Sequence, residues 1–131
     1  MYVLDANAVV DYLRGKGAVA ANLLAVSPAE IGLPSVAAYE VWVGVLGSQN
    51  AARRTVLFEQ FLATLRILPF DGSTSRKAAE LRHVLERKGE AIGPLDTLIA
   101  ATALVNGAIL VTRNVREFAR IPELKVVNWH D

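Results

Sequence analysis

The fold is decided by residues 93–114, which read GPLDTLIAATALVNGAILVTRN. Gly93 and Pro94 begin an almost wholly apolar helical stretch, and the pair Asn106-Gly107 stops it. The four residues that follow, 108–111, are apolar without interruption, which is typical of a strand buried on both faces of a parallel sheet. A buried helix followed directly by a buried strand predicts an α/β domain.

The same alternation of short apolar runs and longer helical stretches extends to both ends of the chain. Strands that alternate with helices predict a mainly parallel sheet with right-handed crossovers. The other predicted strands are 2–4, 31–33, 66–70 and 125–127, and the other predicted helices are 8–14, 19–26, 35–46, 51–65, 74–88 and a short turn at 115–119.

Length and composition are those of one compact domain. The chain has 131 residues, is 53% hydrophobic and has a mean hydropathy of +0.32, which excludes a disordered tail and predicts apolar surface for another protein. A net charge of +1 does not indicate a nucleic-acid-binding protein, so any such binding would have to come from a local site. The absence of cysteine excludes disulfides and thiolate chemistry and permits the cytoplasm. We expect neither a secretory signal nor a membrane span.

Oxygen-bearing side chains gather at one predicted edge of the sheet. Asp5 and the pair Thr112 and Asn114 follow strands directly, whereas Asp96 and Glu40 lie in the first turns of helices. Ligands of such sheets bind at the carboxyl ends of the strands, where helix N-termini also point, so we expect these side chains to meet. Taken singly, Asp5 and Asn114 also fit the role of helix cap or turn residue, and Asp96 fits that of a first-turn acid.

Glu40 and Asp96 stand in unusually apolar surroundings. Glu40 is the only charged residue between Ile31 and Ala52. Two carboxylates about 5 Å apart repel by roughly 3 kcal/mol at an effective dielectric near 20, in addition to their desolvation. Such a cluster needs basic neighbours, shared protons or a hard cation.

Oxygen ligands without cysteine favour Mg²⁺, or Mn²⁺ in its place, over zinc. A carboxylate-held Mg²⁺ activates water and stabilises charge on a phosphate, so phosphodiester hydrolysis is the expected reaction. The two histidines, His83 and His130, are expected to be solvated structural residues.

Four segments, in this order, resemble PIN-domain ribonucleases, specifically the VapC-type toxins of bacterial type II toxin–antitoxin pairs. They read YVLDAN (2–7), LPSVAAYE (33–40), IGPLDTLIAA (92–101) and LVTRNVREF (110–118), and with VVNW (126–129) they span essentially the whole chain. The resemblance implies one PIN domain over residues 1–131, with a three-layer α/β/α fold and a small central sheet. It also implies a cytoplasmic, Mg²⁺-dependent endoribonuclease that cuts tRNA or another structured RNA, forms a homodimer and is inhibited by a VapB-type antitoxin.

The resemblance assigns roles to the acidic positions. Asp5 and Asp96 match the usual Mg²⁺ ligands, and Glu40 matches the supporting acid or water-orienting group. Asn114 matches a fourth catalytic position where many members have Asp, which leaves one or two metal ions open.

Five further residues are predicted around this cluster. Asn7 and Thr112 match supporting polar positions, and Glu117 is a candidate additional carboxylate. Arg113 and Arg116 follow the strand 108–111 closely and are the preferred contacts to RNA phosphates.

Two other functions remain open. An aspartyl-phosphate phosphatase also places Asp after its first strand, but the second Asp expected two residues later is Asn7 here. A non-catalytic binding module would keep the fold and the metal without cleavage, and Asn114 is compatible with it. For a dimer, Tyr39, Trp42 and Leu46 are candidate interface residues, but core packing is the favoured expectation for each of them taken singly.

Overall fold

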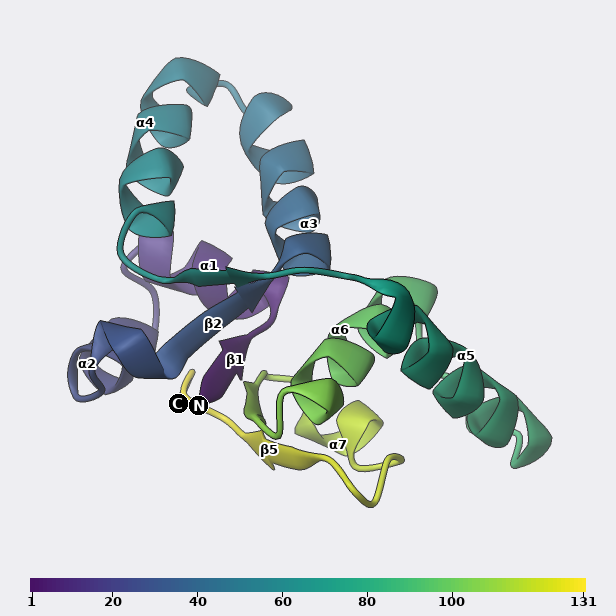
Figure 1. Cartoon of the computed structure of the whole chain (residues 1–131). Coiled ribbons are helices and arrows are strands. Elements are labelled where there is room, and N and C mark those ends of the chain that lie inside the picture. Colours follow the sequence, from purple (N-terminus) through teal and green to yellow (C-terminus); the bar gives the residue numbers. More distant parts are fainter.

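Five parallel strands form the central sheet of the computed structural model, which describes residues 1–131 (Figure 1). Every strand pair is parallel, so the predicted sheet is confirmed. The sheet order is β3-β2-β1-β4-β5. The strands are β1 (Tyr2–Leu4), β2 (Ile31–Pro34), β3 (Arg66–Leu68), β4 (Ile109–Val111) and β5 (Lys125–Val127).

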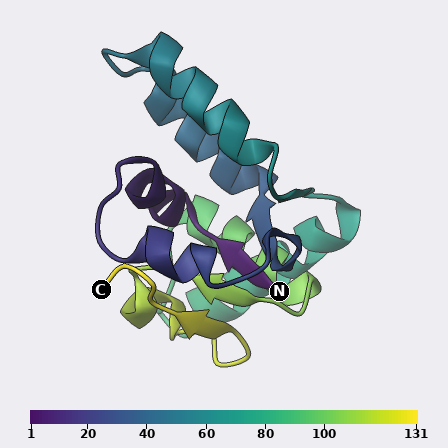
Figure 2. The ribbon, with the colours of Figure 1, turned by 90° about the vertical axis from the view of Figure 1, so that its left-hand side faces the viewer.

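Helices cover both faces of this sheet, which gives the three-layer α/β/α architecture (Figure 1). The α3 and α4 helices form an antiparallel pair that projects beyond the sheet (Figure 2). No helix is both long and apolar enough to cross a bilayer. The helices are α1 (Ala6–Leu13), α2 (Val19–Leu24), α3 (Ser35–Leu46), α4 (Ala51–Leu62), α5 (Gly72–Arg87), α6 (Pro94–Val105) and α7 (Val115–Phe118), with a 3-10 turn η1 at Pro28–Glu30.

Helix boundaries differ from the predicted ones where a side chain caps the helix. The α1 helix begins at Ala6 instead of residue 8 because Asp5 accepts a hydrogen bond from the backbone N–H of Ala8 (2.9 Å). Asp71 caps α5 in the same way, and that helix begins at Gly72. The predicted strand 66–70 ends at Leu68, before a proline that has no N–H to continue the ladder.

The sheet order places a topological switch point at the carboxyl ends of β1 and β4. After β1 the chain continues to β2 and β3 on one side of the sheet, and it later returns to β4 and β5 on the other. The connections from two neighbouring strands therefore leave in opposite directions, which is where α/β sheets bind ligands. The Asp5 N–H donates to the carbonyl of Val111 (3.2 Å), so the residue after β1 is fixed beside the end of β4.

The α3 helix is apolar on all sides but is not wholly buried. Ala37 and Val41 face the core, whereas Tyr39, Val43 and Leu46 are 58%, 57% and 67% exposed. Core packing is therefore wrong for Tyr39 and Leu46, which lie on the surface of the projecting helix pair. Trp42 is half-buried and packs edge-on against Phe58 of α4, with ring centroids 4.8 Å apart.

Candidate active site

Asp5 lies at this switch point, at the junction of β1 and α1. Its side chain is the N-cap of α1, so the structural role weighed from the sequence is real. The residue is only 5% exposed. Burial raises the pKa of Asp5, although the side chain of Thr112, the Ala8 N–H and the charges of His130 and Arg113 oppose this. The carboxylate is held in a fixed orientation and is costly to ionise without a positive partner.

Glu40 reaches the same region from α3. It is half-buried, and its Oε1 atom is buried without a hydrogen-bond partner. Burial raises the pKa of Glu40, and the charge of Asp5 raises it further. A buried carboxylate oxygen without a donor is rare, because leaving it unpaired costs roughly 1–3 kcal/mol. Glu40 is therefore suited to a partner that the protein chain does not supply.

Asp96 is the most strongly perturbed acid of the site. It lies in the first turn of α6. Burial and the charges of Glu117, Glu40 and Asp5, in that order, raise the pKa of Asp96 to about 6. The structure thus brings together the three acids predicted from separate segments, because the charges of Asp5 and Glu40 both raise the pKa of Asp96.

Glu117 joins the three predicted acids as a fourth carboxylate. Its Oε1 accepts a hydrogen bond from the backbone N–H of Gly93 (3.3 Å), and its hydrogen bond with Asp96 adds to the raised pKa of Asp96. Gly93 stands close to Asp96 as well, because a Cβ on Gly93 would lie 3.2 Å from Asp96 Oδ2. The glycine before α6 therefore makes room for the Asp96 carboxylate.

The remaining predicted polar residues divide into two groups. Thr112 is fully buried at the end of β4, and its hydroxyl oxygen accepts a hydrogen bond from the backbone N–H of Asn114 (3.0 Å). Asn7 and Asn114 are exposed, and neither side chain makes a hydrogen bond within the chain. Thr112 thus supports the acidic cluster directly, whereas the side chains of Asn7 and Asn114 face solvent.

The donor set fits a hard cation. All candidate ligands are oxygens, and none of the four carboxylates forms an ion pair with a basic side chain. The acids repel one another, and Glu40 Oε1 has no partner. No three Asp, Glu or His side chains stand close enough together to form a ready set of metal ligands. Binding a cation here would therefore need side chains to move toward it.

His130 corrects the expectation that both histidines are solvated. Its side chain is 2% exposed, and its Nδ1 lies 2.7 Å from Oδ2 of Asp11 in α1. The peptide around it is tied to the start of the chain, because the Ala18 N–H donates to the His130 carbonyl (3.1 Å) and Asn22 Nδ2 donates to the carbonyl of Trp129 (3.0 Å). His83 is exposed, as expected.

Arg113 also pairs with Asp11, so it is not simply free to bind phosphate. The Arg113 side chain is 50% exposed, whereas that of Asp11 is 8% exposed. Burial alone would raise the pKa of Asp11, but the hydrogen bond to His130 and the charges of Arg113 and His130 outweigh it and lower that pKa. Arg116 is exposed and makes no ion pair. Sequence reasoning missed Asp11 because its partners lie 102 and 119 residues away, and only the fold joins them.

Comparisons with known proteins agree with this architecture. Residues 2–124 match the PIN domain family. The chain is 38% identical to Ribonuclease VapC2 of Rickettsia felis over 99 residues, covering 76% of this chain and 74% of that protein. It is 29% identical to the tRNA(fMet)-specific endonuclease VapC of Shigella flexneri over 128 residues, covering 98% and 97% of the two chains.

Solved structures give the same result. The VapBC2 complex of Rickettsia felis, crystallised with a DNA fragment from its promoter, contains a chain that matches with a TM-score of 0.91 and 34% identity over 98% of both chains. DNA-bound VapBC from Salmonella typhimurium matches with a TM-score of 0.91 and 28% identity over 98% of this chain and 97% of that one. The resemblance in the sequence motifs is thereby confirmed, and the chain belongs to the PIN-domain family and, within it, to the VapC ribonucleases.

Proposed function

We propose that this VapC ribonuclease is a Mg²⁺-dependent toxin that hydrolyses phosphodiester bonds in tRNA or another structured RNA, with Mn²⁺ able to replace Mg²⁺. The observation that supports it best is the cluster of Asp5, Glu40, Asp96 and Glu117 beside the carboxyl ends of the strands. The charge of Asp5 raises the pKa of Glu40, the charges of the other three acids raise the pKa of Asp96, and none of the four forms an ion pair with a basic side chain. A divalent cation is the counterion that such a cluster lacks.

Asp5 and Asp96 are the proposed metal ligands. When bound, Mg²⁺ supplies positive charge that activates water and stabilises the charge that develops on the phosphate. Asp5 is oriented by its hydrogen bond to the Ala8 N–H, and Asp96 by its place in the first turn of α6. Both residues are therefore anchored at the ends of regular elements, so that binding an ion would need movement of side chains and not of the backbone.

Glu40 is the proposed group that orients the attacking water. Its unpartnered Oε1 can accept a hydrogen bond from that water, and its raised pKa suits it to take up the proton. Glu117 supports the cluster from α7, and Thr112 supports it from the position directly after β4. Asn114 faces solvent, so we assign it an auxiliary role at the catalytic edge and leave Asn7 as a supporting position beside Asp5.

Substrate contacts follow from exposure and charge. The Shigella flexneri relative is named for tRNA(fMet), which supports a structured RNA as the substrate class. Arg116 is exposed and unpaired, and Arg113 keeps half of its side chain in solvent although Asp11 holds it. We propose that Arg116 binds RNA phosphate and that Arg113 does so in the orientation fixed by Asp11.

The proposed partners are a VapB-type antitoxin and a second copy of the chain, with the single domain 1–131 acting in the cytoplasm. The solved relatives are VapBC complexes, which supports the antitoxin. The exposed apolar residues Tyr39, Val43 and Leu46 of α3 support an interface. We expect Val43→Glu to convert a dimer to a monomer in light scattering. A wild-type chain that is monomeric at high concentration contradicts the dimer.

A non-catalytic metal-binding module is the competing function, and two measurements on the same sample separate it from a nuclease. Calorimetry with Mg²⁺ and Mn²⁺ tests whether the acids hold a cation, and incubation with total RNA tests cleavage. We expect binding and metal-dependent cleavage in the wild type, and loss of both in Asp5→Ala/Asp96→Ala. Metal binding by the pure wild type without cleavage favours the module, and undiminished cleavage by the double variant contradicts the proposed site.

A further inference from the structure

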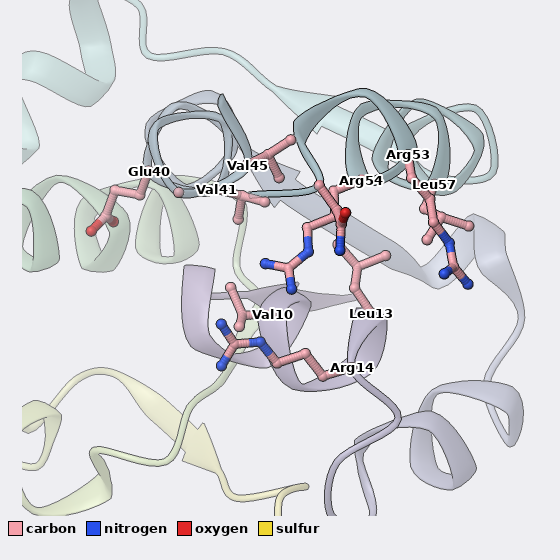
Figure 3. Close-up of a pocket in the computed structure, with 11 residues that line it drawn as sticks. Val10, Leu13, Arg14, Glu40, Val41, Val45, Arg53, Arg54 and Leu57 are labelled. Carbon is pink, nitrogen blue, oxygen red and sulfur yellow. The ribbon is translucent and has the colours of Figure 1, made fainter. Parts of the chain in front are cut away.

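We propose that the groove between α1, α3 and α4 binds the RNA strand next to the scissile phosphate, through Arg14, Arg53 and Arg54. This inference rests on the proposed ribonuclease function. The groove has a volume of about 340 Å³, and one of its lining residues is Glu40. Glu40 is the member of the acidic cluster that the groove reaches, and Figure 3 shows it at one end of the lining, with its carboxylate pointing away from the arginines.

Three arginines reach this groove from two helices that are distant in the sequence. Arg14 follows the end of α1, whereas Arg53 and Arg54 lie in the first turn of α4. Figure 3 shows the guanidinium groups of Arg14 and Arg54 in the same opening, whereas Arg53 points away from them, beside Leu57. The positive charge is thus a product of the fold and is not visible as a basic run in the sequence.

The three arginines carry uncompensated charge. None of them forms an ion pair or a side-chain hydrogen bond, and Glu40 is the only acid in the groove lining. On α5, by contrast, Arg76 pairs with Glu80 and Arg82 with Glu86. These arginines of α5 are thus neutralised by neighbouring glutamates on a solvated face, whereas the arginines of the groove have no anionic partner within the chain.

The placement of Arg53 and Arg54 is unfavourable for α4 itself. Cations in the first turn of a helix oppose its dipole, which favours negative charge at that end. The α4 helix also has no side-chain cap and no acid in its first turn. A polyanion bound at this position would compensate both features, because its phosphates would face the guanidinium groups and the start of the helix.

The remaining lining of the groove suits nucleotides better than phosphate alone. Val10, Val41 and Leu57 are among the apolar residues that line the groove together with the arginines. Apolar and guanidinium surfaces accept the faces of bases and riboses, whereas guanidinium forks bind phosphate oxygens. An RNA strand with its scissile phosphate at Asp5 and Asp96 must continue over neighbouring surface, and this groove adjoins Glu40.

The test measures RNA binding without cleavage. In the full chain carrying Asp96→Asn, Arg14→Gln/Arg53→Gln/Arg54→Gln is compared with the matched α5 control Arg76→Gln/Arg82→Gln/Arg87→Gln. The probe is fluorescently labelled single-stranded RNA or bulk tRNA, titrated between 50 and 200 mM salt. Each lost phosphate contact lowers the salt slope of single-strand binding by about 0.7, so three lower it by about 2. The affinity lost at 50 mM salt should then exceed that lost at 200 mM by roughly 20-fold.

Several outcomes decide the proposal. The control should leave the slope nearly unchanged, and Arg14→Lys/Arg53→Lys/Arg54→Lys should keep it, because lysine retains the charge. Unchanged melting temperatures verify that the exposed substitutions leave the fold intact. Equal RNA affinity of the groove variant and the control overturns the proposal. If the groove variant instead loses only antitoxin binding, the groove is a protein-docking surface and the RNA proposal is overturned.

The failure of this proposal is distinguishable from failure of the proposed function. Cleavage by the wild type with unchanged RNA binding by the groove variant rejects the groove and leaves the nuclease. Absence of metal-dependent cleavage by the wild type, together with loss of RNA binding in the groove variant, rejects the nuclease mechanism and supports the groove.

Discussion

Asp96 is the residue whose ionisation couples the site to stability. Its ordinary pKa of 3.8 is raised to about 6 in the folded chain, so the folded state binds this proton more tightly than the unfolded state. The free energy of unfolding therefore falls as pH rises from about 4 to about 6, and the loss is complete above that window. Asp5 and Glu40 also have raised pKa values and act in the same direction.

The first prediction concerns the metal-free protein. In EDTA at pH 7.5, Asp96→Asn should raise the free energy of unfolding by about 1 kcal/mol, because the full shift of about 2 pKa units is reduced by solvent around a half-buried group. Urea denaturation at several pH values measures this, and the variant should lose most of the slope between pH 4 and pH 6. If the variant is less stable than the wild type at pH 7.5 in EDTA, the claim that the ionised Asp96 destabilises the metal-free fold is wrong.

The second prediction uses the glycine beside Asp96. In Gly93→Ala the new Cβ would lie 3.2 Å from Asp96 Oδ2, so the carboxylate must shift by a few tenths of an ångström. We expect RNA cleavage to fall about tenfold, since misplacement of 1 Å can cost about a hundredfold. Gly72→Ala is the matched control, because nothing lies within 4 Å of its added Cβ. Equal cleavage rates for the two variants would show that the position of Asp96 is not critical.

The sequence contains enough information to predict the residues that act through their local surroundings. Asp5 is identifiable because it follows a buried strand, and Glu40 because it is a lone charge in an apolar helix. The fourth carboxylate, Glu117, was predicted with less support because it lies in a short polar turn. Asp11 and His130 could not be predicted, since 119 residues separate them and neither stands out locally.

At the scale of elements, α1 is joined to the last residues of the chain and to the segment after β4. Asp11 of α1 binds both His130 and Arg113, which come from the segment after β5 and the segment after β4. The charges of His130 and Arg113 also lower the pKa of Asp5. The pairing therefore connects α1 with the segments that follow β4 and β5, and its charges act on Asp5.

The third prediction concerns the pairing of Asp11 with His130 and Arg113. Asp11→Ala leaves His130 buried without its partner and releases Arg113, and it should lower the free energy of unfolding by about 2 kcal/mol at pH 7. Because the pKa of Asp11 is lowered on folding, this stabilisation is present above pH 4 and is lost as pH falls below it. Urea denaturation at pH 7 and pH 3 measures both effects. If the free energy of unfolding at pH 7 falls by less than about 0.5 kcal/mol, the stabilising role of Asp11 is contradicted.

Element boundaries were predicted least well where local capping or strand ends set them. Helix starts moved by two residues at α1 and α5 because Asp5 and Asp71 cap them. The turn η1 has no apolar periodicity and was not predicted. The α3 helix was predicted correctly as a helix. Its residues are apolar on every side, so the sequence could not show which side would be exposed, because packing against α4 decides that.

At the scale of the whole molecule, strand order positions the site. Alternating strands and helices predict a parallel sheet, but the order β3-β2-β1-β4-β5 comes from tertiary pairing. That order places the ends of β1 and β4 side by side and brings four distant segments to one edge of the sheet. The net charge of +1 hides this arrangement, because an acidic cluster and an arginine groove lie next to each other.

The central claim is that this acidic cluster cleaves RNA, and end-mapping of cellular RNA after brief expression tests it most directly. Wild type and Asp5→Ala are expressed for equal times, and new RNA ends are compared between them. We predict discrete new ends in structured RNA with the wild type, at least about a hundredfold fewer with Asp5→Ala, and growth inhibition by the wild type alone. The same ends at the same abundance in both samples would contradict the account.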